Sequence, residues 1–179
     1  MSRSFPRFGL LALFAATATD AAGGEARFKA NDIRTLFVIG KNTNRNEVQY
    51  GIRLDNECSP VGNEPVYAYW RDYEKGPEVT DDLSMLDRSV YGIRNQRVLA
   101  RAPGESKILM SLKATPDRGI AVFIRKREGK CVSESIATIN GGAASLERVF
   151  VHVAGFMSVD WIELRGQLNG QPAVERVKR

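Results

Sequence analysis

The chain has 179 residues, with 26 lysines and arginines against 21 aspartates and glutamates, one histidine and a formal net charge of +5. This length suffices for one domain with a proper hydrophobic core but not for two. Basic and acidic residues are interspersed, whereas nucleic-acid-binding proteins gather lysine and arginine on one face, so we expect no nucleic-acid partner.

The N-terminus has the features of a secretory signal peptide. Arg3 and Arg7 precede an apolar run from Phe8 to about Ala18, and small residues follow this run. A membrane anchor is the alternative, but a spanning helix needs about 20 apolar residues, more than this run contains. We therefore expect cleavage near Ala18 or near Ala21 and Ala22. Removal of residues 1–22 leaves a net charge of about +4, and we expect a periplasmic or secreted location and no transmembrane anchor.

Alternation of apolar and polar residues predicts that the domain is built from strands. In residues 47–54, EVQYGIRL, the side chains of Val48, Tyr50 and Ile52 share one face, as in a half-buried strand. The preceding segment 35–40, TLFVIG, is apolar on both faces and fits a central strand. The residues between these segments, NTNRN, favour a hairpin turn, because asparagine tolerates left-handed backbone and its amide caps its own turn.

Eight further segments have strand patterns. They are joined by turn residues such as Asn140-Gly141 and Asn169-Gly170, so neighbouring strands should be antiparallel. The segments are 65–73, 97–101, 106–114, 119–127, 130–139, 145–154, 159–167 and 171–178.

Residues 80–92 interrupt the strand pattern and predict one short helix. Leu83, Leu86 and Val90 recur at helical spacing within this segment. Thr80 is placed to cap the start of such a helix, and Gly92 is placed to stop it.

About ten strands and one helix favour a barrel over a sandwich, because closure removes the edges that a long meander leaves exposed. The predicted fold class is all-β, a mostly antiparallel meander closing into a barrel like that of calycins and lipocalins. We expect residues 1–22 to be the signal peptide, 23–34 a flexible N-terminal segment and 35–179 a single β-barrel-like domain. A barrel of this size permits a ligand pocket without proving one.

The chain has two cysteines, Cys58 and Cys131. In an oxidising compartment, two well-separated cysteines most often pair, so we expect a disulfide bond. A redox or metal-binding thiol is the alternative, but there is no Cys-x-x-Cys motif and only one histidine. The sequence therefore predicts no metal site and no cofactor.

No catalytic constellation is visible, so we assign no catalytic residue. The sequence lacks a Gly-x-Ser-x-Gly elbow, and His152 alternates with Val151 and Val153 as a structural strand residue would. Asp160 and Glu163 are three apart on an expected strand and so point to opposite faces. Whether the protein is an enzyme is left open, with a non-enzymatic role favoured.

Two groups of side chains are candidates for ligand binding. Tyrosine and tryptophan have an apolar body with one polar group, which suits a pocket that buries and orients a ligand. The asparagine amides offer donors and acceptors at the expected mouth of the barrel. Ordinary core packing and pinning of the hairpin are the structural alternatives for the two groups. The candidate residues are Asn42, Asn44, Asn46, Tyr50, Tyr69, Trp70 and Tyr91.

These motifs resemble a family of mainly bacterial, exported proteins known only as a domain of unknown function. The shared pattern is an apolar strand, a basic residue, an Asn-rich turn and Val-x-Tyr, then a Pro-Val-x-x-Tyr-Trp strand and a helix closing with Tyr-Gly. The resemblance covers roughly residues 35–95 and implies no activity. The matching positions are Lys41, Asn42, Asn44, Asn46, Val48, Tyr50, Pro65, Val66, Tyr69, Trp70, Tyr91 and Gly92.

Together these features predict an exported, non-enzymatic binding protein of the cell envelope. It would hold a small amphipathic ligand in or at the mouth of the barrel. The first alternative is a structural or protein-interaction module of the periplasm with a solid core, whose partner is an envelope protein. The second alternative is a hydrolase with an unrecognised site, in which His152 acts with a carboxylate.

Overall fold

The computed structural model describes residues 34–178 apart from 77–78, 103 and 156–157. The expected signal peptide and the N-terminal segment up to residue 33 lie outside the described residues. Within the described part, eleven strands form one sheet and a single helix accompanies it. The elements are β1 (Arg34–Lys41), β2 (Glu47–Ile52), β3 (Val66–Arg71), β4 (Thr80–Asp82), α1 (Met85–Tyr91), β5 (Ile93–Ala102), β6 (Glu105–Leu112), β7 (Gly119–Arg127), β8 (Lys130–Ile139), β9 (Gly142–Ala154), β10 (Ser158–Leu168) and β11 (Gln171–Lys178).

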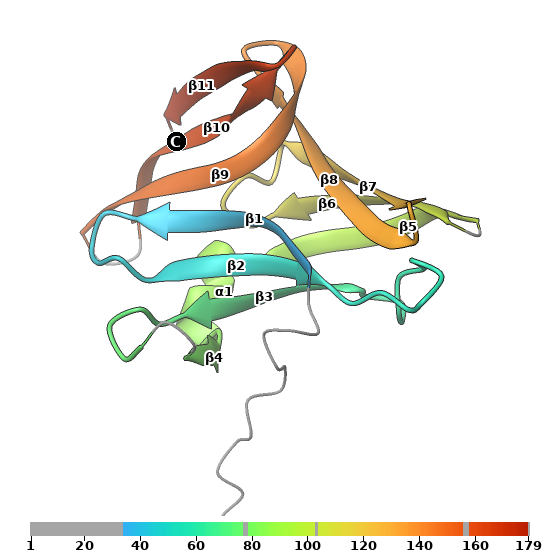
Figure 1. Cartoon of the computed structure of the whole chain (residues 1–179). Helices are drawn as coiled ribbons and strands as arrows, with labels where there is room; N and C mark the ends of the chain where they lie inside the picture. The colour runs from blue at the N-terminus through green and yellow to red at the C-terminus, as the bar shows by residue number, and fades with distance from the viewer. Residues whose placement is uncertain (1–33, 77–78, 103, 156–157, 179) are drawn as a thin grey trace, which may run out of the picture.

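The long strand β9 is the branch point of the sheet. One of its edges pairs with β10, which continues the sheet to β11. Its other edge pairs first with β8, in antiparallel fashion, and then with β1, in parallel fashion. Two wings therefore leave this edge, one running β1-β2-β3-β4 and the other β8-β7-β6-β5 (Figure 1).

The two wings curl toward each other and meet where β3 approaches β5. In the described residues no backbone ladder joins these two strands. Instead the side-chain amide of Gln96 in β5 accepts a hydrogen bond from Val66 N at 2.9 Å and donates one to Val66 O at 3.1 Å. A side chain thus bridges the seam of the barrel-like curl.

Side chains from both wings fill the space inside the curl. The Phe37 and Tyr50 rings stack at a centroid distance of 4.6 Å. Ile108 and Met110 of β6 and Val149 of β9 complete this interior with almost no exposed area. The alternation predicted for this strand is confirmed from Glu47 to Tyr50, and Val48, Tyr50 and Ile52 are all buried. Gly51 is buried as well, and β2 ends at Ile52, before Leu54.

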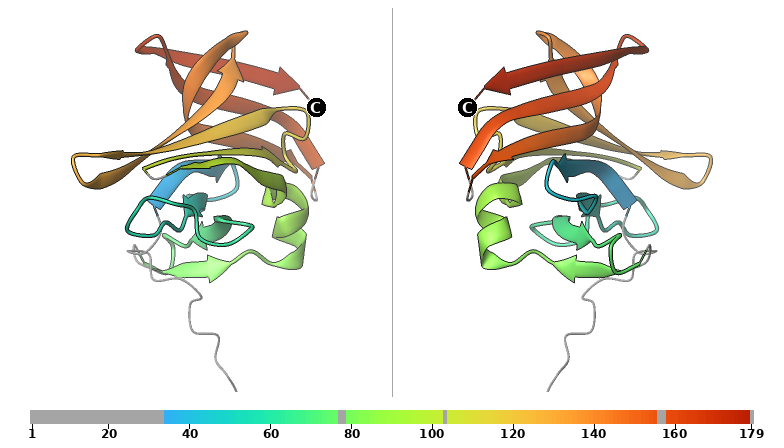
Figure 2. Two further views of the ribbon diagram at one scale, coloured as in Figure 1. Left: turned by 90° about the vertical axis from the view of Figure 1, so that its right-hand side faces the viewer. Right: turned by 90° about the vertical axis from the view of Figure 1, so that its left-hand side faces the viewer.

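Helix α1 starts later than the sequence pattern predicts. Thr80 does not cap it, because Thr80–Asp82 pairs with β3 as the short strand β4. The cap is Ser84, whose Oγ accepts a hydrogen bond from Asp87 N at 3.1 Å. Gly92 does end the helix, and α1 spans the distance between the levels of β4 and β5 (Figure 2).

The disulfide between Cys58 and Cys131 is present, with a Cα–Cα distance of 5.4 Å. It joins the loop after β2 to β8 and so ties one wing to the other, which confirms the predicted pairing. The all-β class, the single short helix and the barrel-like curl are confirmed as well. The parallel pairing of β1 with β9 is the main departure from an antiparallel meander.

Candidate functional site

The Asn-rich turn (residues 42–46) uses its amides to hold the backbone in place. The Asn42 side chain accepts a hydrogen bond from Val153 N at 3.1 Å and donates one to Val153 O at 3.4 Å, continuing the β1–β9 pairing. Asn44 Oδ1 accepts from Asn46 N at 3.2 Å. Asn46 Oδ1 accepts from Glu74 N at 3.2 Å, which fixes the turn to the β3–β4 connection.

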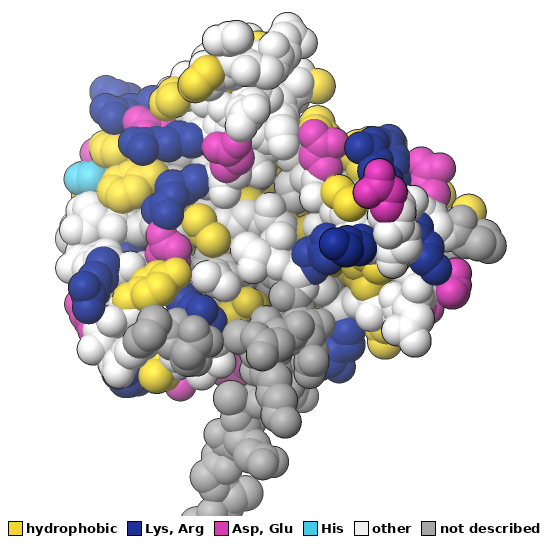
Figure 3. Space-filling view, in the orientation of Figure 1, with side chains coloured by type: hydrophobic (Ala, Val, Ile, Leu, Met, Phe, Trp, Pro, Cys, Tyr) yellow, Lys and Arg dark blue, Asp and Glu magenta, His cyan; other side chains and the backbone are white. Residues whose placement is uncertain are grey.

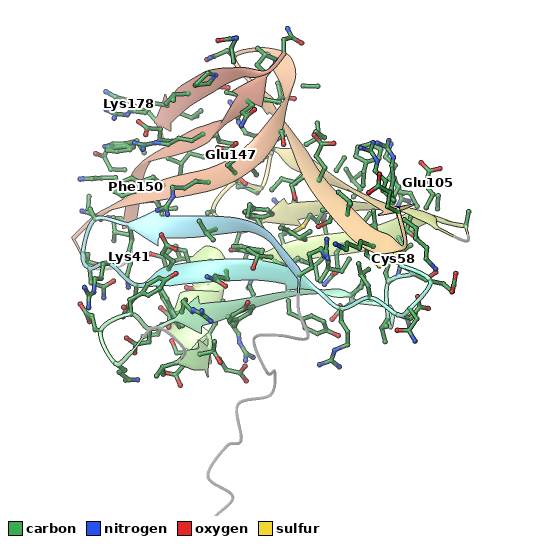
Figure 4. The ribbon with its side chains drawn as sticks, viewed as in Figure 1. Lys41, Cys58, Glu105, Glu147, Phe150 and Lys178 are labelled. Atoms are coloured by element: carbon green, nitrogen blue, oxygen red, sulfur yellow. A yellow bond between two sulfur atoms is a disulfide. The ribbon has the colours of Figure 1, made fainter. Side chains whose placement is uncertain are left out.

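The turn lies at one end of the curled sheet. Lys41, just before the turn, is at this end, while Cys58 of the disulfide is at the opposite end (Figure 4). The end marked by Lys41 is called the mouth below.

Tyr50 points into the core rather than toward the mouth. Its hydroxyl donates a short hydrogen bond to the carbonyl oxygen of Tyr91, so it links β2 to the last residue of α1. Complete burial raises the pKa of Tyr50, and burial, with a smaller effect of Asp87, raises the pKa of Tyr91 to about 12. Both tyrosines are therefore neutral hydrogen-bonding groups at physiological pH.

Trp70 is the centre of a small polar-aromatic cluster at the mouth. Its indole Nε1 donates a hydrogen bond to Asp87 Oδ2 at 3.1 Å, and Ser84 Oγ donates to the same carboxylate oxygen at 2.6 Å. The Lys41 ammonium lies over the Trp70 ring, 4.3 Å from its centroid. The Tyr91 ring meets Trp70 edge-on at 5.7 Å. Lys41 at the end of β1 and Asp87 and Tyr91 of α1 thus surround the Trp70 indole.

On one side of this cluster is an apolar hollow of about 260 Å³. Its walls come from α1, from β1 and the turn, and from the β9–β10 ends. Leu86 is 54% exposed there, although it occupies a predicted apolar position of the helix. The lining residues are Lys41, Thr43, Ser84, Leu86, Asp87, Val90, Tyr91, Val153 and Val159.

On the other side is a polar hollow of about 450 Å³, lined by Lys41, Asn46, Trp70, Asp72, Lys75, Asp81, Asp82, Ser84 and Asp87. Lys75 Nζ contacts carboxylate oxygens of Asp72 at 3.0 Å and of Asp81 at 2.9 Å. The hydrogen bond from Lys75 lowers the pKa of Asp72, and the bonds to Asp81 and Asp72 raise the pKa of Lys75. Both shifts favour the charged forms of Asp72 and Lys75.

The two hollows share Lys41, Ser84 and Asp87, so they are neighbours across the Trp70 cluster. The first hollow is lined by aliphatic residues such as Leu86, Val90 and Val153, and the second is lined mainly by charged residues. Such a surface offers contact to a molecule with an apolar part and a polar part. The carboxylates of the polar hollow outnumber its ammonium groups four to two, which favours a ligand whose polar part carries positive charge.

The seven predicted ligand-binding residues separate into two groups. Asn46, Trp70 and Tyr91 line the two hollows. The amides of Asn42 and Asn44 bind backbone or turn atoms, Tyr50 lies in the core, and the Tyr69 hydroxyl donates to Gln49 Oε1 at 3.1 Å.

Sequence reasoning missed the residues that α1 and the β9–β10 ends contribute. The helical spacing of Leu86 and Val90 predicts only that they lie on one face of a helix that starts near Thr80. Because α1 starts at Met85, it presents Leu86 at the apolar hollow. Val153 and Val159 reach the mouth only because β9 pairs with β1, a contact that no local pattern indicates.

His152 lies on the outer face of β9. Its ring stacks on Trp161 of β10 at a centroid distance of 4.9 Å, and its Nδ1 is 3.6 Å from Asp160 Oδ2. The guanidinium group of Arg176 lies over the Trp161 ring, 4.0 Å from its centroid. Hydrophobic, basic and histidine side chains adjoin on this side of the molecule (Figure 3). The stacked arrangement favours the structural interpretation of His152, and the hydrolase hypothesis stays a prediction.

The described residues contain no group of three or more His, Cys, Asp and Glu side chains that could hold a metal ion. No helix among them has the length and apolarity needed to cross a bilayer.

The fold and the mouth define a class: an all-β protein with a curled, branched sheet and an amphipathic surface site between strand ends and a helix. Residues 37–176 match the family described as Domain of unknown function (DUF4833), and the chain belongs to this family. The resemblance found in the motifs is thereby confirmed. Neither the curated proteins nor the solved structures contain a match to the chain.

Proposed function

We propose that the protein is a non-enzymatic binding protein that holds a small amphipathic ligand at the mouth of its curled sheet. The observation that carries the proposal is the pair of adjoining hollows, one aliphatic and one charged, on either side of Trp70. The interior is occupied by stacked and interlocked side chains such as Phe37 and Tyr50, so the mouth supports binding better than the core does.

The ligand is expected to be an aliphatic or aromatic molecule with an amine or other cationic group. Its apolar part would replace water against Leu86, Val90 and Val159. Its cationic part would lie among Asp81, Asp82 and the other carboxylates of the polar hollow. The indole nitrogen of Trp70 is hydrogen-bonded to Asp87, and the Trp70 ring would lie between the apolar part and the cationic part of the ligand.

The proposed location is the periplasm or the exterior of the cell. A disulfide persists in oxidising compartments, and residues 1–22 have the features of a signal peptide. Expression of the full chain, followed by N-terminal sequencing of the protein recovered from the periplasm, tests this. A new N-terminus near residue 22 supports export, and an intact N-terminus in the cytoplasm contradicts it.

Ligand capture tests the binding function. The purified protein is incubated with a lipid and metabolite extract, and bound molecules are identified by native mass spectrometry. We expect amphipathic cations to be retained by the wild-type protein. The Leu86→Asp variant should retain about tenfold less, because a charge in the apolar hollow opposes burial by roughly 1–2 kcal/mol. Val174→Asp, at another exposed apolar position, is the matched control. Equal retention by all three proteins would exclude the mouth as the site.

A structural or interaction module of the envelope is the second candidate. The filled interior favours it, because a solid core leaves function to the surface. In that case the extract experiment yields no small molecule, and affinity capture with the wild-type protein recovers a partner protein through a surface that Leu86→Asp does not alter.

A further inference from the structure

The seam between the two wings leaves two strand edges without strand partners. Strand β5 pairs only with β6, so its outer edge has no ladder in the part of the chain that the structure describes. In the same described part, the ladder between β3 and β4 covers Tyr69 to Arg71. The side chain of Gln96 bridges the seam by hydrogen bonds to Val66.

A groove follows the unpaired edge of β5. A cleft of about 980 Å³ is lined by Ile93–Gln96 together with Val66–Ala68 of β3. A second hollow of about 370 Å³ is lined by 96–100, and the two share Asn63 and Gln96. The combined depression, called the β5 groove, runs along about eight residues of strand, or roughly 25 Å at the usual rise. This length fits an extended peptide of seven or eight residues.

The β5 groove is basic. Arg94, Arg97 and Lys113 line it and have no acidic partner among the described side chains. Arg88 also lines it, with its guanidinium 3.9 Å from Asp82 in an exposed pair. The acidic groups in the lining are Glu64 and Asp82. Positive charge therefore exceeds negative charge along the groove.

We propose that the β5 groove binds an extended acidic segment of a partner protein by β-strand addition. An open strand edge supplies backbone donors and acceptors for such a segment, and alternate side chains of the segment set specificity. The arginines decide which segment can bind. They repel the equally basic groove of a second copy and attract carboxylates. The groove shares Asp82 with the polar hollow of the mouth, but Arg94 and Arg97 line neither hollow of the mouth, so this inference does not depend on the proposed ligand site.

The length of the groove distinguishes a peptide from a small anion. A single phosphate or carboxylate needs only two or three of the cations. Arg94 and Arg97 are spread along β5, and Lys113 follows β6. Register shifts at 93/95 and 98/100 flank the regular part of β5. A strand bound to this part would displace the Gln96 side chain from the backbone of Val66.

The test uses the full disulfide-bonded chain and three fluorescein-labelled peptides, each of ten residues. The first alternates threonine and glutamate, and the second has lysine in place of glutamate. The third keeps the glutamates but is N-methylated at alternate residues, which blocks strand pairing and preserves charge. Fluorescence anisotropy gives the affinity of each peptide. The double variant Arg94→Glu, Arg97→Glu tests the groove, and Arg127→Glu at the exposed end of β7 is the control. Urea midpoints check that both variants fold.

We expect saturable binding of the threonine–glutamate peptide. The wild type should bind the lysine peptide and the N-methylated peptide about tenfold or more weakly than the threonine–glutamate peptide. The double variant should bind the threonine–glutamate peptide more weakly by the same factor. A tenfold loss corresponds to the loss of one to two charge-assisted or backbone hydrogen bonds. Arg127→Glu should match the wild type. Equal binding of the N-methylated peptide would replace strand addition by simple charge attraction and overturn the proposal. Absence of binding, or self-association abolished by the double variant, would overturn it too.

Discussion

At the scale of single residues, Tyr50 links the core to α1 through one buried hydrogen bond. Replacing it by phenylalanine keeps the ring stacked on Phe37 but removes the hydroxyl that donates to Tyr91 O. A buried carbonyl without a donor costs about 1–3 kcal/mol, so Tyr50→Phe should lower the free energy of unfolding by that amount in urea titrations. Tyr69→Phe is the control, because Gln49 is only partly buried and can bind water instead. A larger loss for the control would contradict this account of Tyr50.

Glu163 gives the molecule a pH dependence. Its carboxylate accepts hydrogen bonds from Arg176 Nη2 at 2.9 Å and from Arg165 Nε at 2.6 Å, and these bonds lower the pKa of Glu163. A carboxyl with a lowered folded pKa stabilises the fold above its ordinary pKa of about 4.3, and this stabilisation disappears as pH falls through the lowered value.

The wild type should therefore lose more stability than Glu163→Gln when the pH falls from about 7 to about 3. Urea midpoints at the two pH values measure the difference. Glu147→Gln, an exposed position of the neighbouring strand β9, should leave the pH dependence of the wild type unchanged. Parallel curves for the wild type and Glu163→Gln would show that the two arginine bonds do not stabilise the fold.

At the scale of elements, the end of α1 depends on Gly92. A Cβ at this position would lie 2.3 Å from the backbone oxygen of Arg88, so the last turn of the helix itself leaves no room for a side chain. Gly92→Ala should destabilise the protein by about 1–3 kcal/mol, as overpacking does. At Gly119 a Cβ would make only an ordinary contact, 3.5 Å from Leu109, so Gly119→Ala is the control in the same thermal unfolding experiment. Equal melting temperatures for the two variants would contradict the steric argument.

Local patterns predicted individual elements where one local signal dominated. The alternation in β2 and the asparagine–glycine turns gave the strands and their antiparallel neighbours. The predicted start of α1 is Thr80, whereas the observed cap is Ser84, one turn later. Pairing of β4 with β3 decides between them, and this pairing is a tertiary contact that helix signals do not include.

At the scale of the whole molecule, the disulfide holds the two wings together over a separation of 73 residues. The chain-entropy estimate for such a loop is about 4 kcal/mol. The double variant Cys58→Ala, Cys131→Ala should lose about that much free energy of unfolding, measured in urea. Treating the wild type with a reductant should give the same midpoint as the double variant. If reduction leaves the wild-type midpoint unchanged, the bond does not contribute to equilibrium stability.

The candidate site was only partly predictable for a reason of topology. Trp70 and Tyr91 carry their own aromatic signal and were identified from the sequence. Val153 and Val159 are ordinary strand valines until β9 pairs with β1, which brings distant parts of the chain to one mouth. The branching at β9 likewise depends on long-range pairing, so no window of the sequence contains it.

Binding at the mouth can be tested by tryptophan fluorescence, because the chain has only two tryptophans, Trp70 and Trp161. In the Trp161→Phe variant all tryptophan emission comes from Trp70, and in Trp70→Phe it comes from Trp161. Titration with n-octylammonium below its micelle concentration should change the emission of Trp161→Phe saturably and leave that of Trp70→Phe unchanged. An unchanged emission from Trp70, or an equal change from both tryptophans, would contradict binding at the mouth.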